Sequence, residues 1–464
     1  MIRARALLLI FGLLAAMMGT ARAAVFYPSH FTLSNGLQVV IVPNRLAPVV
    51  SQMVWYKVGS ADETPGKSGL AHYLEHLMFR GTDSVPAGEF SKVIAKQGGH
   101  DNAFTSYDYT AFYEEIEAKR LPMIMQMEAD RMQNLRIRKE TAEPELRVVL
   151  LERQQRTDNS PEGSFIEKLQ NEFMPRYPYG RPVIGWKKDI EQLTASDARK
   201  FYETHYAPNN AVVVISGDVR VEDVLSLAAA TYGRVPARDV ALQRDFGPAP
   251  QPQERDLTVV DARVEQPEIL WRFAVPSYAT QKDNEAYAYE VLAEVLDGGE
   301  TGVLYKKLVT ELGTASGVET SYDPDARGET GFTLAASLRA GQSYKKLEEA
   351  LRSTLNDAAQ KGLDANEIEK AKQRLQRSAI FAREGLTMPG YAFGMALTTG
   401  HNVADVEAWP DRIDAVTVTE VNAALRKLAS SKREIMSALL PDPHAPAAKR
   451  GMLQPILDRG VGIR

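Results

Sequence analysis

The sequence reads Gly69-Leu-Ala-His-Tyr-Leu-Glu-His-Leu-Met-Phe79 across one largely apolar segment, whose apolar positions recur at helical spacing. Within it, His72 and His76 are four positions apart, and Glu75 follows His72 by three. Residues three and four apart lie on the same face of a helix. The two imidazoles are therefore placed to bind one metal ion together. The Glu75 carboxylate is close enough to act on a water molecule held there.

The order of these residues is His-x-x-Glu-His, a signature of zinc peptidases and the reverse of the commoner His-Glu-x-x-His. So short a pattern also arises by chance, and a pair of structural histidines is the alternative interpretation. Zinc in a hydrolase usually takes three protein ligands and leaves the fourth position for water. A zinc site here therefore requires a third ligand from another part of the chain.

The best candidate segment for that ligand is Glu145-Leu-Arg-Val-Val-Leu-Leu-Glu-Arg153. Glu145 and Glu152 are seven positions apart, which is about two helical turns, so both side chains point the same way. The apolar residues between them would anchor the helix in the core, where a carboxylate is costly unless it is paired or metal-bound. These considerations do not rank Glu152 above Glu145.

The apolar patterns predict an α+β chain whose two halves repeat one order of elements. In the first half, the sequence pattern is typical of strands at residues 31–33, 37–42, 49–58, 111–116 and 210–217. It is typical of helices at 90–96, 121–135 and 140–157. In the second half, the pattern is typical of strands at 269–275, 331–338 and 434–440. It is typical of helices at 283–296, 344–359 and 366–383. We predict two related domains, each a mostly antiparallel sheet flanked by helices. Two unrelated α+β domains are the alternative.

A proline-rich segment at residues 246–254 separates the two halves. Three prolines within five positions make an extended connector rather than part of a core. The predicted boundaries are a first α+β domain at 24–245, the linker at 246–254 and a second α+β domain at 255–464. The second half has no His-x-x-Glu-His, so the first domain is predicted to bind the metal and catalyse, and the second to be non-catalytic.

Residues 1–23 have the pattern of a cleavable signal peptide, with a basic start, a short apolar run and Ala21-Arg-Ala23 at the end. We expect an exported protein, and the short signal suits a bacterial periplasm. No later apolar run is long enough to span a membrane. The chain has no cysteine, which excludes disulfides, thiol catalysis and thiolate metal sites. Its formal charge of −5 makes it a poor candidate for nucleic-acid binding.

The segment Ser68–Thr82 resembles the corresponding part of the pitrilysin/insulinase-type zinc peptidases, which include the mitochondrial processing peptidases and many bacterial periplasmic relatives. The similarity continues in short motifs and covers most of residues 28–220; these motifs lie at residues 98–105, 179–180, 206–210 and 217–218. The family takes its third metal ligand from a glutamate far downstream of the second histidine, and Glu152 matches it, 76 positions after His76. Glu145 matches an accompanying glutamate that supports the ligands.

The resemblance implies a Zn²⁺ ion held by His72, His76 and Glu152 in a zinc metalloendopeptidase. Such an ion lowers the pKa of a water molecule that it binds and polarises a carbonyl group. Glu75 would take the proton of that water and later deliver it to the leaving amine.

The resemblance also implies a substrate-binding edge at Asn102-Ala103-Phe104, where an extended peptide adds to the sheet as a further strand. Backbone recognition of this kind requires an extended, unfolded substrate. Turn chemistry after Gly98-Gly99 is the alternative interpretation of Asn102.

One departure from the family concerns the second half, where full-length members carry an arginine and a tyrosine that hold the substrate. The matching stretch is residues 308–316, in which Val309 and Ser316 stand at the two positions; Tyr322 is nearby. The family includes two-chain enzymes, so we expect this chain to be the metal-bearing subunit of a heterodimer whose homologous partner supplies the pair. The alternatives are a catalytically relic structural subunit of such a complex, and a dedicated leader-processing peptidase.

Overall fold

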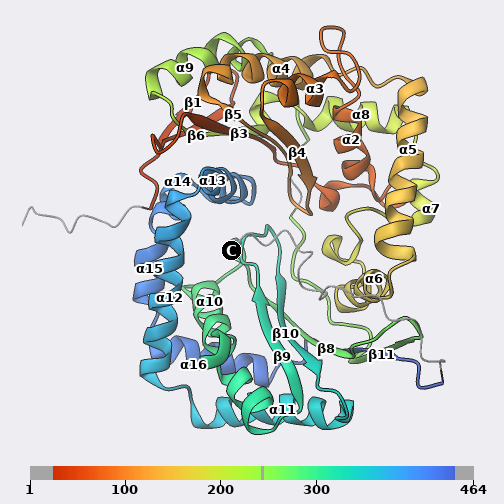
Figure 1. Ribbon diagram of the computed structural model, residues 1–464, viewed down its shortest axis with the longest axis vertical. Coiled ribbons are helices and arrows are strands. Elements are labelled where there is room, and N and C mark those ends of the chain that lie inside the picture. Colours follow the sequence, from red (N-terminus) through yellow and green to blue (C-terminus); the bar gives the residue numbers. More distant parts are fainter. Residues whose placement is uncertain (1–24, 242–244, 445–464) are drawn as a thin grey trace, which may run out of the picture.

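Two β-sheets face each other across the molecule, and helices cover the outer side of each sheet (Figure 1). The computed structural model describes residues 25–241 and 245–444, so the predicted signal peptide at 1–23 lies outside the described residues. The predicted α+β class is confirmed, with two mostly antiparallel sheets. Within the described ranges, no helix combines the length and the apolar character needed to cross a membrane.

The first sheet has the strand order β1-β2-β6-β3-β5-β4. Its strands are β1 (Ser29–Thr32), β2 (Gln38–Pro43), β3 (Val49–Tyr56), β4 (His100–Thr105), β5 (Thr110–Glu117) and β6 (Ala211–Gly217). Every neighbouring pair is antiparallel except β2 with β6. All seven residues of β6 are buried, as expected for a central strand covered on both faces. The edge strand β4, in contrast, is only partly buried.

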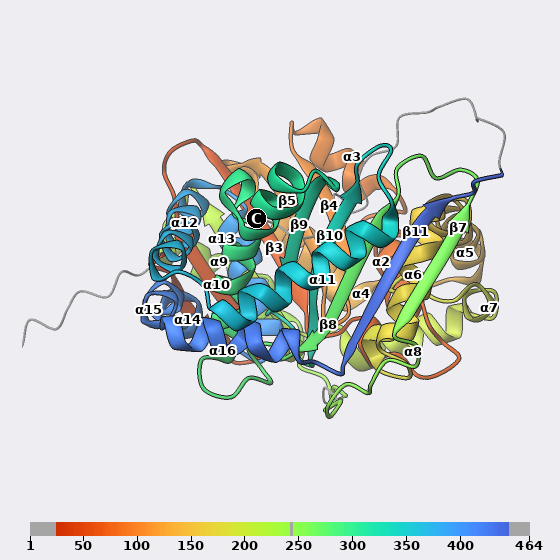
Figure 2. The ribbon, with the colours of Figure 1, turned by 90° about the horizontal axis from the view of Figure 1, so that it is seen from below.

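The second sheet repeats this arrangement with the order β7-β11-β8-β10-β9 (Figure 2). Its strands are β7 (Asp256–Asp261), β8 (Glu268–Val275), β9 (Ala315–Tyr322), β10 (Thr330–Leu338) and β11 (Glu434–Pro441). Here the one parallel pair is β7 with β11. Its order and strand directions match those of β2-β6-β3-β5-β4 in the first sheet. The predicted relation between the two halves is therefore confirmed.

The helices predicted in both halves are confirmed. The helices of the first half include these and others: α2 (Leu70–Met78), α3 (Glu89–Lys96), α4 (Leu121–Asn134), α5 (Lys139–Arg153), α8 (Ala195–His205) and α9 (Val221–Ala230). The helices of the second half include α10 (Glu285–Leu296), α11 (Tyr344–Lys361), α12 (Ala365–Glu384), α15 (Trp409–Ala415) and α16 (Val418–Ala429). The helix predicted at 140–157 comprises α5 and a π-helical turn at Gln154–Asp158.

Sequence patterns did not predict the edge strands β7 and β9, nor helices α8, α9, α15 and α16. Strand β7 has mostly exposed and half-buried positions, strand β9 has mostly half-buried ones, and both have few buried residues. A strand at a sheet edge packs few side chains, so its apolar pattern is weak.

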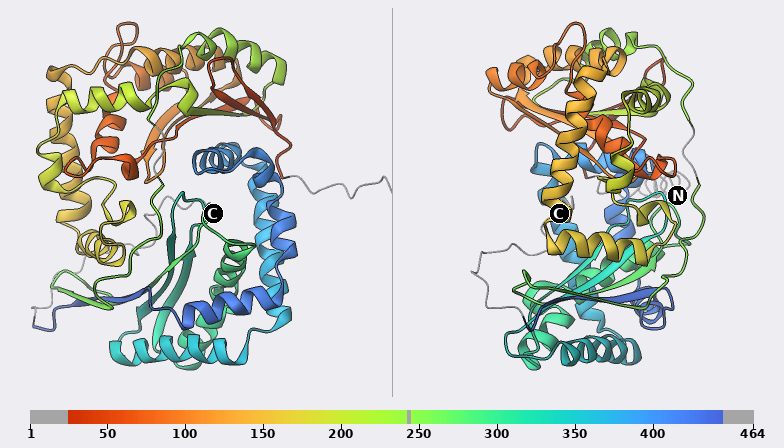
Figure 3. Two further views of the ribbon diagram at one scale, coloured as in Figure 1. Left: turned by 180° about the vertical axis from the view of Figure 1, so that it is seen from behind. Right: turned by 90° about the vertical axis from the view of Figure 1, so that its right-hand side faces the viewer.

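Two further helices cross from one half to the other (Figure 3). Helix α6 (Pro161–Phe173) belongs to the first half in sequence but packs on β7 and β11 of the second sheet. Helix α13 (Met388–Thr398) belongs to the second half but packs on β3 and β6 of the first sheet. Phe165 of α6 and Phe393 of α13 are fully buried in the two cores that result. Each sheet is therefore covered on its inner face by a helix from the other half of the sequence.

We expect Gly394→Ala to loosen the packing of α13 on the first sheet. A Cβ at Gly394 would lie 2.0 Å from the Trp55 indole, which is fully buried and has no room to move. Overpacking of this kind costs about 1–3 kcal/mol, which exceeds the helix-propensity gain of about 1 kcal/mol from replacing glycine. Gly317→Ala is the control, because a Cβ there meets no atom within 4 Å. Urea unfolding should show a lower midpoint for Gly394→Ala only; equal midpoints would contradict the packing.

Candidate metal centre

Helix α2 is positioned by a close backbone contact at its first turn. Gly69 precedes the helix with φ +88°, a left-handed conformation that glycine adopts without steric cost. A Cβ on Gly69 would lie 2.5 Å from the carbonyl oxygen of Ile184, so a larger residue does not fit. The leucines of α2 are buried in the first core. With that face buried, the polar positions of the helix are directed toward α5 and β4, which both contact it.

Helix α5 brings a carboxylate to both imidazoles of α2. The Nε2 atom of His76 lies 3.2 Å from Glu152 Oε2, and the Nε2 atom of His72 lies 3.7 Å from the same oxygen. One donor atom from each of the three residues lies within 4.8 Å of the others. Two imidazole nitrogens and a carboxylate oxygen form a donor set that suits zinc.

Glu145 lies on the opposite side of the His76 ring. Its Oε1 atom is 2.8 Å from His76 Nδ1, and its other oxygen pairs with Arg80. A carboxylate that accepts the Nδ1–H of a histidine fixes the tautomer with its lone pair on Nε2. The two glutamates that the sequence did not rank therefore occupy different places: Glu152 lies between the imidazoles and Glu145 lies behind one of them.

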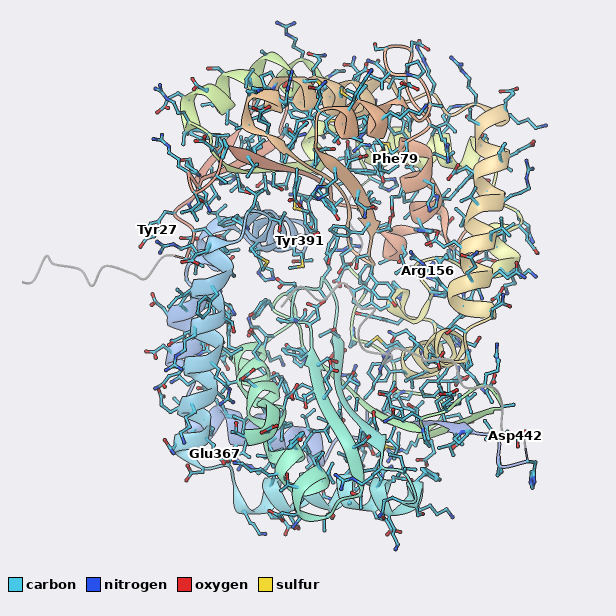
Figure 4. All side chains as sticks on the ribbon, in the orientation of Figure 1. Tyr27, Phe79, Arg156, Glu367, Tyr391 and Asp442 are labelled. Carbon is cyan, nitrogen blue, oxygen red and sulfur yellow. The ribbon has the colours of Figure 1, made fainter. Side chains whose placement is uncertain are left out.

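The charges around Glu152 favour its anionic form. Burial alone would raise its pKa, but the hydrogen bond to His76 and the electrostatic influence of His72 and Arg156 lower the pKa of Glu152 to about 2. Arg156 donates to the outer oxygen, Oε1, over 2.7 Å, and Figure 4 shows it beside the lower end of α5. The inner oxygen, Oε2, is the one that faces both histidines.

The pKa values of the two histidines shift in opposite directions. Burial lowers the pKa of His72 to about 4, so its imidazole stays neutral, as a metal ligand must be. Burial also disfavours the charged form of His76, but hydrogen bonds to Glu145 and Glu152 outweigh it and raise the pKa of His76 to about 9.

Glu75 is held apart from the donor cluster by the first sheet. Its Oε2 atom accepts a hydrogen bond of 2.5 Å from Thr105, the last residue of β4. Burial raises the pKa of Glu75 to about 7. The same contact places the end of an edge strand next to the metal-binding helix.

The predicted substrate segment lies on that edge strand. Asn102, Ala103 and Phe104 pair with β5 on one side, and β4 is the last strand of the sheet on the other. The Asn102 side chain accepts a hydrogen bond from the Ala103 backbone N–H. The Phe104 ring stacks on Tyr391 of α13, which points toward the first sheet in Figure 4.

Sequence reasoning assigned no role to Arg80 or Arg156, and it placed Thr105 at the end of the substrate-binding edge without predicting its contact with Glu75. The two arginines could have been predicted to lie near the site, because Arg80 follows His76 and Arg156 follows Glu152 by four positions, about one turn of helix. No local pattern connects Thr105 to Glu75, since the contact depends on how β4 packs beside α2.

Two family models match the chain. The model described as insulinase (peptidase family M16) matches residues 38–187, and the model described as the peptidase M16 inactive domain matches residues 192–375. The break between them precedes β6, which completes the first sheet. The division between the models therefore does not coincide with the division between the two sheets.

Known proteins resemble the chain over most of its length. A Helicobacter pylori protein named zinc protease PqqE is 32% identical over 365 residues, which cover 78% of this chain and 81% of that protein. The crystal structure of a protease from Helicobacter pylori matches with a TM-score of 0.83 and 27% identity, covering 90% of this chain and 100% of that one. The periplasmic protease PqqL from Escherichia coli shares the fold at 19% identity and a TM-score of 0.76, with 89% of this chain covering 47% of PqqL.

The His-x-x-Glu-His sequence of α2 is the signature of the inverted zinc peptidases, and here it lies beside α5, which carries Glu145 and Glu152, on a duplicated α+β fold. The likeness to zinc protease PqqE covers most of both chains. This chain belongs to the insulinase family, peptidase family M16. Its relatives are named as proteases, which supports a peptidase function.

Proposed function

We propose that this chain is a zinc-dependent endopeptidase, with its catalytic domain at residues 24–245 and a non-catalytic domain at 255–464 joined by the linker 246–254. The observation that carries the proposal is the convergence of donor atoms from His72, His76 and Glu152 within 4.8 Å. Glu75 lies on the same helix, outside this cluster.

A zinc ion held by these three residues supplies a Lewis acid that acidifies water and polarises a carbonyl group. Glu75 then serves as general base, because its carboxylate is buried beside the centre and is not one of the three donors. Its hydrogen bond from Thr105 holds one oxygen in place and leaves the other free for proton transfer. After protonation, Glu75 donates the proton to the amine that leaves. Glu145 keeps the His76 ring oriented through Nδ1.

We propose that the substrate is a peptide or an unfolded segment that adds to β4 as an extra strand. The outer edge of β4, with Asn102, Ala103 and Phe104, has no partner strand in the described sheet. An open strand edge offers main-chain hydrogen bonds to an extended peptide whatever its sequence. Since β4 ends at Thr105, such a peptide would lie beside Glu75.

We propose that a homologous partner chain supplies the arginine–tyrosine pair. The valine and serine side chains at the two positions have neither a cation nor a phenol to offer a substrate. Val309 is also buried in the second core, and Ser316 lies on β9. The nearby Tyr322 donates its hydroxyl to the carbonyl of Pro276. The chain also corresponds to about half of PqqL, so a second chain of similar fold would complete an enzyme of that size. The predicted signal peptide and the periplasmic relative favour a periplasmic location.

The test is peptide hydrolysis by the purified chain, alone and after co-expression with proteins that co-purify. We expect zinc-dependent cleavage that rises strongly when the partner is present. Full activity from the isolated monomer would contradict the two-chain assembly but not the peptidase. No hydrolysis in either preparation would favour the relic structural subunit. Sequencing the products from a mixed peptide pool separates the remaining alternative, since one preferred cut site indicates leader processing.

A further inference from the structure

A buried arginine of the second half joins two segments of the first half. Arg327 lies in the loop between β9 and β10. Its two terminal nitrogens contact the two carboxylate oxygens of Asp62 at 3.0 and 2.9 Å, and its Nε contacts Asp108 at 2.8 Å. The exposed fractions of the three side chains are only 7%, 8% and 4%. A forked guanidinium that satisfies two carboxylates in this way fixes their relative position.

The residue after Asp62 holds the start of the metal-binding helix. The Glu63 side chain is buried, and its two oxygens accept the backbone N–H groups of Gly69 and Ala71 at 3.1 and 2.8 Å. No side chain at the N-cap position of α2 supplies such a bond. Glu63 therefore satisfies amides that the first turn of a helix leaves without intrahelical partners. Arg181 fixes the same segment by donating to the Glu63 carbonyl oxygen.

The second carboxylate bound by Arg327, that of Asp108, lies near the end of β4, on the side of the centre where Glu75 is held. Asp108 follows β4 by three residues, and β4 ends at Thr105, the partner of Glu75. The two segments also pair directly, because Ala61 donates its backbone N–H to the Tyr107 carbonyl at 2.8 Å. One guanidinium thus holds the segment that precedes α2 and the segment that follows β4.

We propose that Arg327 is a positioning residue for the metal centre, acting on α2 through Asp62 and Glu63 and on β4 through Asp108. The non-catalytic half of the chain then sets the placement of His72 and its neighbours, although it contributes no donor atom. This inference rests on the proposed zinc peptidase function for its effect on catalysis. Its structural part, the order of α2, does not depend on that function.

The test compares Arg327→Met with a matched variant, Arg433→Met. Arg433 also pairs with a carboxylate of the β9–β10 loop, Glu329, and donates to the carbonyl of Ala249, but it does not contact residues 60–63. Both changes remove a half-buried or buried arginine from the same region. Only Arg327→Met should affect the metal centre.

We expect Arg327→Met to speed hydrogen exchange at the Gly69 and Ala71 amides, weaken zinc binding about tenfold and lower kcat about 10–100-fold, the usual effect of losing a residue that orients metal ligands. Arg433→Met should leave all three measurements unchanged. Arg327→Lys, which pairs with one carboxylate but lacks the fork, should give intermediate values. If Arg327→Met does not fold, Arg327→Lys decides on the same measurements.

A double variant tests the route through Glu63. In Glu63→Gln one oxygen becomes an amide nitrogen, so one of the two bonds to α2 is lost. If Arg327 acts through Glu63, the double variant with Arg327→Met should bind zinc within about twofold of the weaker single variant, because coupled residues are not additive. Additive losses, or wild-type exchange and zinc affinity in Arg327→Met, would overturn the inference. Wild-type protein that binds zinc but hydrolyses no peptide, either by itself or with its co-purifying partner, would overturn the proposed function and leave the structural part of the inference intact.

Discussion

Glu75→Gln is expected to lower kcat for peptide hydrolysis by about 10²–10⁴-fold, the usual contribution of a general base. An amide of the same shape can still accept the hydrogen bond from Thr105, but it cannot take a proton. Zinc should remain bound, because the Glu75 carboxylate is not among the three clustered donors. Steady-state kinetics on a fluorogenic peptide, with zinc content measured on the same sample, checks both statements.

Glu143→Gln is the matched control for this variant. Glu143 lies on α5, its side chain is 58% exposed, and it pairs only with Lys139 on the surface. The same chemical change there should leave kcat within about twofold, as for most surface substitutions. If Glu75→Gln keeps wild-type activity, the role of Glu75 as base is wrong. If it loses zinc together with activity, Glu75 belongs to the binding site.

Glu152→Gln is expected to weaken zinc binding by about a hundredfold or more. Protein zinc sites of four ligands bind with about 10–16 kcal/mol, or about 3 kcal/mol for each ligand, and about 1.4 kcal/mol corresponds to a factor of ten. The substitution replaces an anionic oxygen between the two imidazoles with a neutral amide. Competition with a chromogenic chelator measures the affinity.

Glu145→Gln is the comparison that separates the two glutamates of α5. A glutamine there can still accept the Nδ1–H of His76, so we expect a loss of zinc affinity of about tenfold at most, the low end for a residue behind a ligand. Its partner Arg80 is 37% exposed and can be solvated when the carboxylate charge is lost. A larger loss from Glu145→Gln than from Glu152→Gln would reverse their assigned roles.

Much of the fold could be predicted from local patterns. Apolar periodicity located most strands and helices, and the repeated order of elements predicted two related halves, as the matching strand orders confirm. Edge strands such as β9 could not be predicted from apolar periodicity, because few of their side chains are buried. The packing of α6 and α13 on the sheet of the opposite half could not be predicted for a different reason. Amphipathic spacing shows that a helix buries one face, but it does not say which sheet covers that face.

The metal centre, like the fold, has features that local spacing predicts and features that depend on tertiary packing. His72, Glu75 and His76 could be grouped from the sequence, because their proximity follows from helical spacing within one turn. Glu145 and Glu152 share a helix and a face, so local spacing could not separate them. Their positions differ because the packing of α5 against α2 places the Glu152 carboxylate between the imidazoles and the Glu145 carboxylate behind the His76 ring.

The amino-acid sequence was thus sufficient to predict the kind of site, since residue types and local spacing indicate two histidine ligands, a candidate base and a helix with two candidate third ligands. The surroundings of that chemistry depend on contacts between segments far apart in the chain. Thr105 meets Glu75 because β4 packs beside α2, and Arg327 meets Asp62 across 265 residues because the β9–β10 loop docks on the first half. Such contacts arise from sheet register and helix exchange, which no local spacing encodes.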